Sequence, residues 1–206
     1  MRRGSRPNPS RGAERPSVPA RRRWPRHRWG RRHLYGAPET APTGRVLLVG
    51  APNVGKSVLF HRLTGVYVTV SNYPGTTVEV SRGRMQVGGR TVEVVDTPGM
   101  YSLRPVTEEE RVARDMLLRD RADLLVHVVD IKNLRRMLVL TVELLETGLP
   151  VVVAANMADE AERLGLSVDA ARVAARIGAP VVVVAALRGT GMSDLRVAIE
   201  AALPHA

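Results

Sequence analysis

A glycine-rich stretch at residues 50–58 has the residue types and spacing of a loop that binds phosphate groups. It follows an apolar run at 45–49 and leads into a segment with helical spacing. The glycines let backbone N–H groups close around phosphates, and the start of a helix adds positive partial charge. We expect Lys56 to reach the β- and γ-phosphates and the Ser57 hydroxyl to take one position on Mg²⁺. The whole loop reads Gly50, Ala51, Pro52, Asn53, Val54, Gly55, Lys56, Ser57 and Val58.

The lysine of this loop stands out against the composition of the chain. The sequence has 29 arginines and only two lysines, Lys56 and Lys132. Arginine carries a broad planar fork, whereas a phosphate cradle needs a compact charge on a thin stem. A lysine at this place, between a predicted strand and a predicted helix, therefore favours a nucleotide-binding loop over a chance glycine-rich turn.

A second candidate segment, Asp96-Thr97-Pro98-Gly99, follows a predicted strand at 91–95. Ligands of open α/β sheets bind at the carboxyl ends of the strands, so this place suits a site. The Asp96 carboxylate can hold Mg²⁺ through water, and the Gly99 N–H can approach a γ-phosphate. The same residue types favour ordinary turns, but the preceding strand makes a mere turn the weaker interpretation.

A third segment, Asn156-Met157-Ala158-Asp159, follows the predicted strand 150–155 and resembles the base-reading element Asn-x-x-Asp of GTPases. A carboxylate at Asp159 accepts two hydrogen bonds from N1–H and N2–H₂ of guanine. Adenine has no such donor pair and would leave the buried carboxylate without partners. The segment therefore predicts binding of GTP and GDP rather than ATP.

A fourth segment, Ser71-Asn72-Tyr73-Pro74-Gly75-Thr76-Thr77, lies between the first predicted helix and the second predicted strand. We expect Thr77 to supply a Mg²⁺ ligand and to sense the γ-phosphate, with Gly75 and Thr76 beside the nucleotide. Residues 66–79 would then be a switch loop that orders around a triphosphate. The alternative is a loop that leads into a hairpin and has no metal role.

The elements that must position these segments alternate between strands and helices from residue 45 onward. Valine-rich runs at 151–153 and 181–184 are apolar on both faces, as central parallel strands are. Val87-Gly88-Gly89-Arg90 predicts a tight hairpin turn, Thr107 to Glu110 a capping box, and Gly148 and Gly178 helix C-caps. We therefore expect a doubly wound α/β fold with a mostly parallel, six-stranded sheet and one antiparallel hairpin edge. The expected strands are 45–50, 77–87, 90–96, 123–130, 150–155 and 180–185, and the expected helices are 56–64, 108–120, 133–147, 167–177 and 192–202.

The charge of the chain divides it into two parts, a basic extension at 1–44 and a domain at 45–206. The net charge of +11 is concentrated in the extension, which has twelve arginines, two glutamates and no hydrophobic period, so we expect it to be disordered. It would be either an arm for nucleic acid or anionic lipid, or an upstream stretch included by an early start codon. A secretory signal requires an apolar run after its basic residues, and none follows these arginines. No apolar stretch is long enough to span a membrane. The absence of cysteine excludes disulfides, thiol catalysis and cysteine-bound zinc.

Taken together, the four motifs resemble the G domain of FeoB-type ferrous-iron transporters, within the TrmE-Era-EngA-like group of GTPases. The segments Val129–Leu134 and Leu138–Leu145 add to the resemblance, which extends from about 45 to 203. Met157 is informative because most translation and ribosome-assembly GTPases have lysine there. The resemblance implies a Ras-like P-loop GTPase fold that binds GTP, GDP and Mg²⁺.

The resemblance also implies roles for single residues. Asn53 matches the asparagine with which family members hold a K⁺ ion in place of an arginine finger, and backbone carbonyls near Ser71 and Tyr73 would complete that site. Met100 stands where Ras-type enzymes carry a catalytic glutamine, and methionine cannot orient a water molecule. Hydrolysis must then rely on charge stabilisation and backbone positioning, so we expect slow turnover that K⁺ stimulates. The catalytic candidates are Asn53, Lys56, Thr77 and Gly99.

The chain departs from the family pattern on the base side of the site. Family members usually carry Ser-Ala before a basic residue there, whereas this sequence has Ala185-Ala186-Leu187. Backbone N–H groups alone would then support the guanine, which would weaken affinity while Asp159 preserves specificity. Ser71 replaces a usual glycine and Tyr73 a common tryptophan, and neither change looks disabling.

Family members continue into a helical spacer and a polytopic iron-permeation domain, which this sequence does not contain. The resemblance therefore implies a cytoplasmic GTPase that regulates ferrous-iron uptake through a separate membrane permease, at most peripheral at the inner face of the cell membrane. The alternatives are a GTP-binding switch that barely hydrolyses, an RNA-associated GTPase that uses the basic extension, and a remnant without a cellular role. The sequence contains no evident iron ligands and does not indicate an oligomeric state, and His61 and His127 read as ordinary surface or core residues.

Overall fold

The computed structural model describes residues 1, 41–65 and 68–204. Every described element lies in the unit Glu39–Ala206, and the predicted extension falls almost entirely outside the described residues. The strands are β1 (Arg45–Val49), β2 (Val68–Asn72), β3 (Glu79–Val87), β4 (Arg90–Asp96), β5 (Leu124–Asp130), β6 (Val151–Asn156) and β7 (Val181–Val183). The helices are α1 (Lys56–Thr64), α2 (Glu108–Arg119), the 3₁₀ turn η1 (Ile131–Asn133), α3 (Leu134–Leu145), α4 (Ala158–Arg163), α5 (Ala170–Ile177) and α6 (Met192–Ala202).

The strands form one sheet in the order β2-β3-β4-β1-β5-β6-β7. Strands β4, β1, β5, β6 and β7 run parallel, while β2, β3 and β4 pair antiparallel. The register aligns Leu48 with Asp96 and Asp130 with Asn156, so the carboxyl ends of the central strands meet at one edge. This edge is where the sequence places the candidate segments, as the doubly wound fold requires.

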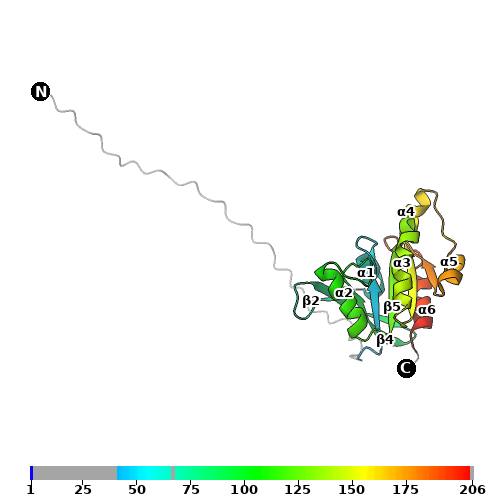
Figure 1. Cartoon of the computed structure of the whole chain (residues 1–206), viewed down its shortest axis with the longest axis horizontal. Helices are drawn as coiled ribbons and strands as arrows, with labels where there is room; N and C mark the ends of the chain where they lie inside the picture. The colour runs from blue at the N-terminus through cyan, green and yellow to red at the C-terminus, as the bar shows by residue number, and fades with distance from the viewer. Residues whose placement is uncertain (2–40, 66–67, 205–206) are drawn as a thin grey trace, which may run out of the picture. The chain divides into compact units, whose positions relative to one another are not determined.

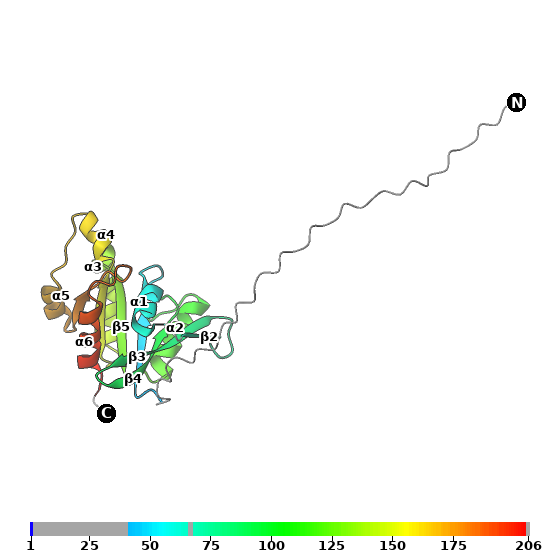
Figure 2. The ribbon, with the colours of Figure 1, turned by 180° about the vertical axis from the view of Figure 1, so that it is seen from behind.

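Helices cover both faces of the sheet and form a core on each side. Figure 1 shows α2 and α3 in front of the sheet, and Figure 2 shows α1 and α6 on the other face. The first core joins the sheet to α1 and α6, with Phe60, Leu195 and Ile199 fully buried. The second joins the opposite face to α2 and α3, with Met116 and Leu144 fully buried. All seven residues of β5 are buried, as expected for a central parallel strand.

The prediction of six strands is wrong, because the sheet has a seventh strand inside the segment expected to be a free switch loop. Strand β2 pairs with β3 from Val68 opposite Gly83 to Asn72 opposite Glu79. Its Val-Thr-Val core has high strand propensity, and pairing satisfies backbone groups that a free loop would leave to solvent. Four of its five residues are exposed, so the strand adds little to the core. A short helix, α4, was also missed.

The predicted hairpin turn, capping box and Gly178 cap are confirmed, whereas the Gly148 prediction is wrong, because α3 has Glu146 as its C-cap. The Thr107 hydroxyl accepts from the Glu110 N–H, and the Glu110 carboxylate accepts from the Thr107 N–H, which forms a capping box at α2. Gly88 and Gly89 have φ of 55° and 72°, the left-handed values that a two-residue hairpin turn of type I′ requires. Gly178 caps α5 with φ of 74°. Within the described part of the chain, no helix has both the length and the apolar character of a membrane span.

Candidate functional site

The glycine loop connects β1 to α1, and two of its glycines have no room for a side chain. A Cβ on Gly50 would lie 2.4 Å from the carbonyl oxygen of Val128, and a Cβ on Gly55 would lie 2.4 Å from the Asn156 amide nitrogen. Gly55 also has φ of 84° and is the N-cap of α1. The loop is therefore packed against the neighbouring strand ends, with the positive end of α1 directly behind it.

Lys56 and Asp96 face each other at the start of α1. The Lys56 Nζ lies 3.8 Å from Asp96 Oδ1, and both side chains are about nine-tenths buried. Burial raises the pKa of Asp96, an effect that the Lys56 charge and the Ser57 hydroxyl partly offset. Burial likewise lowers the pKa of Lys56, against the attraction of Asp96.

The same carboxylate has an unsatisfied oxygen. Among the described residues, Asp96 Oδ1 is the buried side-chain atom that has no hydrogen-bond partner. A buried charge without partners is costly unless a cation or donor reaches it. The arrangement fits a hard cation held by the Asp96 carboxylate and the Ser57 hydroxyl, because Mg²⁺ prefers oxygen ligands.

Residues 97–100 pack against the end of β1 and against the glycine loop. The Thr97 hydroxyl donates to the Leu48 carbonyl over 2.8 Å, which fastens the end of β4 to β1, so this side chain serves the fold. Gly99 passes so close to the loop that a Cβ there would lie 2.7 Å from Pro52 Cγ. Met100 is fully buried and its N–H donates to the Gly50 carbonyl over 3.0 Å. The methionine therefore points into the core and cannot orient a water at the site.

Asn156 joins the glycine loop to the loop at 185–190, which we call the base-side loop. Its Nδ2 donates to the Val54 carbonyl over 2.9 Å, and its Oδ1 accepts from the Ala186 N–H over 3.0 Å. The side chain is 3% exposed, so water does not compete for these bonds. Asn156 thus acts as a positioning residue between the two loops.

The base-side loop at 185–190 uses most of its backbone donors within the loop or with Asn156. Among the described residues, the N–H of Leu187 donates no hydrogen bond, whereas the Ala186 N–H is taken by Asn156. Behind the loop, Arg62 of α1 donates from Nε to the Ala186 carbonyl over 3.0 Å and from Nη2 to the Leu187 carbonyl over 2.6 Å. No local pattern singles out this arginine, which is one of 29 in the chain.

Asp159 lies in the first turn of α4, beyond Met157, which has a left-handed φ of 63°. Its side chain is 10% exposed and pairs with Arg188, whose Nε lies 3.2 Å from Asp159 Oδ2. The left-handed residue turns the chain sharply between β6 and α4, so Asn156 faces the glycine loop while Asp159 faces the base-side loop. Arg188 is a second residue that the sequence alone did not single out.

The expected switch residues contact β3 and the end of α2. Ser71 lies in β2 opposite Val80, and the Tyr73 hydroxyl is 3.5 Å from Asp120 Oδ1 at the end of α2. Burial raises the pKa of that tyrosine, and the nearby carboxylate of Asp120 raises it further. In the described part of the chain, no side-chain hydrogen bond or ion pair joins Ser71, Tyr73 or Thr77 to residues 50–57.

The hairpin tip that contains Thr77 is folded on itself. Thr76 donates from its N–H and its hydroxyl to the Tyr73 carbonyl, each over 3.0 Å. The Tyr73 N–H in turn donates to the Val78 carbonyl over 2.8 Å. Thr77 is exposed at this tip, as is the neighbouring Gly75.

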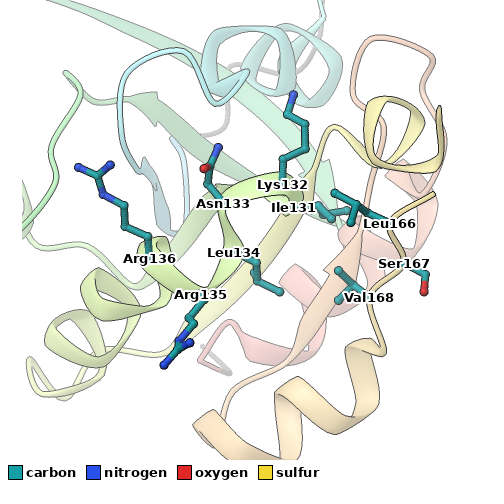
Figure 3. Close-up of a pocket in the computed structure, with 9 residues that line it drawn as sticks. All are labelled: Ile131, Lys132, Asn133, Leu134, Arg135, Arg136, Leu166, Ser167 and Val168. Carbon is teal, nitrogen blue, oxygen red and sulfur yellow. The ribbon is translucent and has the colours of Figure 1, made fainter. Parts of the chain in front are cut away.

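A cavity of about 700 Å³ lies beside the site, between η1 with the start of α3 and the loop after α4. Figure 3 shows Leu134, Leu166 and Val168 around its apolar part, with the Arg135 and Arg136 side chains directed away from one another. None of the predicted nucleotide-binding residues lines it. Its lining consists of Ile131, Lys132, Asn133, Leu134, Arg135, Arg136, Leu166, Ser167 and Val168.

His61 and His127 are not among the residues that form the site. His127 is buried in β5, and its Nδ1 lies 2.8 Å from the Thr141 hydroxyl of α3. Burial lowers the pKa of His127 to about 3, so the ring is neutral in the folded state. His61 is exposed on α1.

Comparison with known proteins identifies the family. The family model described as "Ferrous iron transport protein B" matches residues 44–199. The Fe(2+) transport protein A/Fe(2+) transporter FeoB fusion protein of Porphyromonas gingivalis is 43% identical over 161 residues, which are 76% of this chain and 19% of that protein. The chain thus spans about one fifth of the length of the curated relatives it matches.

Solved structures agree with this result. The G domain of the T. maritima FeoB is 38% identical with a TM-score of 0.70, over 76% of this chain and 96% of that domain. A mutant of S. thermophilus NFeoB bound to GDP is 39% identical with a TM-score of 0.73, over 78% of this chain and 63% of that one. The fold is therefore the P-loop GTPase fold of these G domains, and the chain belongs to the ferrous iron transport protein B family.

Proposed function

We propose that this chain binds GTP and hydrolyses it to GDP and phosphate with Mg²⁺. The observation that carries the proposal is the placement of Asn156, which fixes the glycine loop and the base-side loop as one unit. A phosphate cradle and a base-reading carboxylate at a fixed separation suit a nucleotide. The GDP bound to the S. thermophilus neighbour supports guanine as the base.

Each part of the site has a distinct task in this proposal. Lys56 and the backbone N–H groups of the glycine loop hold the phosphates, and the Asp159 carboxylate accepts from N1–H and N2–H₂ of guanine. Ser57 and Asp96 would hold Mg²⁺, which when bound neutralises charge on the β- and γ-phosphates. Hydrolysis adds water to the γ-phosphorus and breaks its bond to the bridging oxygen, which keeps the electron pair as GDP leaves, while the two water protons leave with the phosphate or pass to solvent.

We further propose that the reaction depends on cation stabilisation rather than on a side-chain base. Met100 is fully buried, so the residue after Gly99 offers no polar group to the attacking water. Asn53 is exposed at the rim of the loop with a left-handed φ of 63°, which suits a ligand for a monovalent cation beside the phosphates. The proposed cation is K⁺, with backbone carbonyls near Ser71 and Tyr73 as further ligands once the hairpin tip rearranges.

We also propose that GTP turnover in this chain regulates ferrous-iron uptake through a membrane permease. The named function of the curated relatives, Fe(2+) transport, supports this assignment. The chain would then act at the inner face of the membrane, through contact with the permease part. Co-purification of the chain with such a permease, in a manner that depends on GTP, would test this part of the proposal.

The test of the hydrolysis proposal is phosphate release from GTP by the full chain in Mg²⁺ buffer. Wild type and Asn53→Ala are compared in KCl and in NaCl. We expect K⁺ to stimulate the wild type severalfold and the Asn53→Ala variant not at all, while both bind GDP. Failure of the wild type to bind GTP or GDP would refute the proposal as a whole.

A second candidate function is a GTP-binding switch that hydrolyses GTP very slowly. The folded hairpin tip favours it, because Tyr73, Thr76 and Val78 bind one another in a closed turn around Thr77. The same assay separates the two functions. Tight GTP binding without phosphate release in either salt would support the switch and refute the hydrolase.

A further inference from the structure

The base side of the site contains an ion pair to which the proposed function gives no role. Arg188 Nε lies 3.2 Å from Oδ2 of Asp159, the residue proposed to read the base. The Asp159 side chain is 10% exposed, whereas that of Arg188 is 60% exposed. Arg188 therefore approaches the carboxylate from the solvent side and covers the edge that a base would have to reach.

The guanine base and the Arg188 guanidinium offer the same kind of hydrogen-bond donors to the Asp159 carboxylate. The N1–H and N2–H₂ edge of guanine is a flat pair of N–H donors on one carbon, and a guanidinium offers the same planar fork to a carboxylate. We propose that Arg188 is an internal competitor of the guanine base, so that the guanidinium and the base take the Asp159 carboxylate in turn. This inference rests on the proposed guanine-nucleotide function, and it assigns Arg188 as a residue that sets nucleotide affinity.

The exchange needs the Arg188 side chain to move but not its backbone. The Arg188 N–H donates to the Ala185 carbonyl over 3.0 Å, and the Gly189 N–H donates to the same carbonyl over 2.9 Å. Arg62 holds the carbonyls of the two preceding residues from behind. Because this turn is fixed, the guanidinium can leave the carboxylate by rotation about its own side-chain bonds.

The structure also bounds the strength of the competition. An ion pair with one largely exposed partner is weak, and its strength falls with added salt. Removing the competitor should therefore tighten guanine-nucleotide binding by about three- to fivefold, the upper part of the range for such pairs. The effect should appear with every ligand that uses the Asp159 carboxylate.

The experiment measures the dissociation constant of fluorescently labelled GDP for the full chain. Wild type, Arg188→Met and a matched control, Arg176→Met, are compared at about 50 and about 500 mM KCl, a range over which exposed pairs become screened. Arg176 is exposed on α5 and, among the described residues, makes no ion pair or side-chain hydrogen bond, so its change removes equal charge without touching Asp159. We expect about three- to fivefold tighter binding for Arg188→Met at low salt, a smaller difference at high salt and no change for the control.

A second arm uses Asp159→Asn with xanthosine diphosphate, whose base carries a carbonyl where guanine has its 2-amino group. The new amide can donate to that carbonyl, and it gives Arg188 no charged partner. In this background we expect Arg188→Met to leave xanthosine diphosphate affinity unchanged. An equal tightening here would mean a general charge effect and would overturn the inference.

The competition by Arg188 and the proposed guanine-nucleotide function are refuted by different results. If the wild type binds GDP and Arg188→Met binds it equally or more weakly, the competition is refuted while the proposed function stands. If the wild type binds no guanine nucleotide, both are refuted.

Discussion

Replacement of Asn156 by alanine tests the feature that holds the site together. The variant removes the donor to the Val54 carbonyl and the acceptor of the Ala186 N–H, which lie 2.9 and 3.0 Å from the amide. Both partner residues are 1% exposed, so their backbone groups would lose their bonds without gaining water. An unsatisfied buried polar group costs about 1–3 kcal/mol, so we expect Asn156→Ala to lower the free energy of unfolding by about 2–4 kcal/mol.

Asn156→Asp separates the two hydrogen bonds. A carboxylate can still accept from the Ala186 N–H, but it has no donor for Val54 and would place an acceptor oxygen about 2.9 Å from that carbonyl. Repulsion between the two acceptors should make this variant at least as unstable as Asn156→Ala. Both variants should also bind GDP at least tenfold more weakly, because the two loops would no longer be held at a fixed separation.

The assay is urea unfolding followed by circular dichroism, with GDP binding measured on the same preparations. Asn133→Ala is the control, since Asn133 is exposed and the Asp130 Oδ2 that accepts its 3.0 Å bond also has the Lys132 ammonium 3.7 Å away, and we expect a loss below about 1 kcal/mol. A loss for Asn156→Ala no larger than that of the control would refute the reasoning. So would an Asn156→Asp variant as stable as the wild type.

Three further predictions follow from single residues. The pKa of His127 falls from 6.5 in the unfolded chain to about 3 in the folded protein, because burial disfavours the charged ring. As the pH is lowered from 6.5 to 3, the unfolded chain binds a proton that the folded protein does not, so the free energy of unfolding should drop by up to about 1.4 kcal/mol per pH unit. Acid titration of stability should show this slope in the wild type and lose it in His127→Asn, which keeps a polar atom for Thr141. Thr107→Ala removes the N-cap of α2 and should cost about 1 kcal/mol in thermal or urea unfolding, whereas Thr107→Ser should cost little. Gly50→Ala would place a Cβ 2.4 Å from the Val128 carbonyl, so it should lower both the melting temperature and GDP affinity, and unchanged values would contradict the packing of the loop.

Local sequence patterns were sufficient to predict most of the central sheet and the glycine loop between β1 and α1, whereas the run 181–184, expected to be a central strand, forms the partly exposed edge strand β7. Strands β5 and β6 are apolar on both faces because helices cover both faces, and the glycine loop needs its glycines where neighbouring strand ends leave no room for a Cβ. Both signals arise from a few consecutive residues. The Asp96 and Asn156 segments were predicted to share an edge because parallel strands end there, which the register confirms.

The missed elements are those whose cause lies outside their own residues. Strand β2 is mostly exposed, and it exists because β3 offers it a partner, which the segment 68–72 does not encode by itself. Helix α4 has only six residues and begins at a left-handed Met157, so its pattern is too short to show a period. The first element was missed because its pairing partner had to be known, and the second because it is too short.

The base side of the site depends on arginines that no local pattern singles out. Arg62 uses its planar fork on two successive carbonyls of the base-side loop, and Arg196 of α6 donates from Nη2 to the carbonyls of Arg62 and Leu63 at the end of α1, each over 2.9 Å. Helix α1 therefore carries the phosphate loop at its start and supports the base-side loop near its end. The base-side loop is thus held at its carbonyls by Arg62, while its Ala186 N–H is held by Asn156. A fork suits carbonyls and a thin ammonium suits phosphates, which explains why a chain so rich in arginine keeps a lysine at position 56.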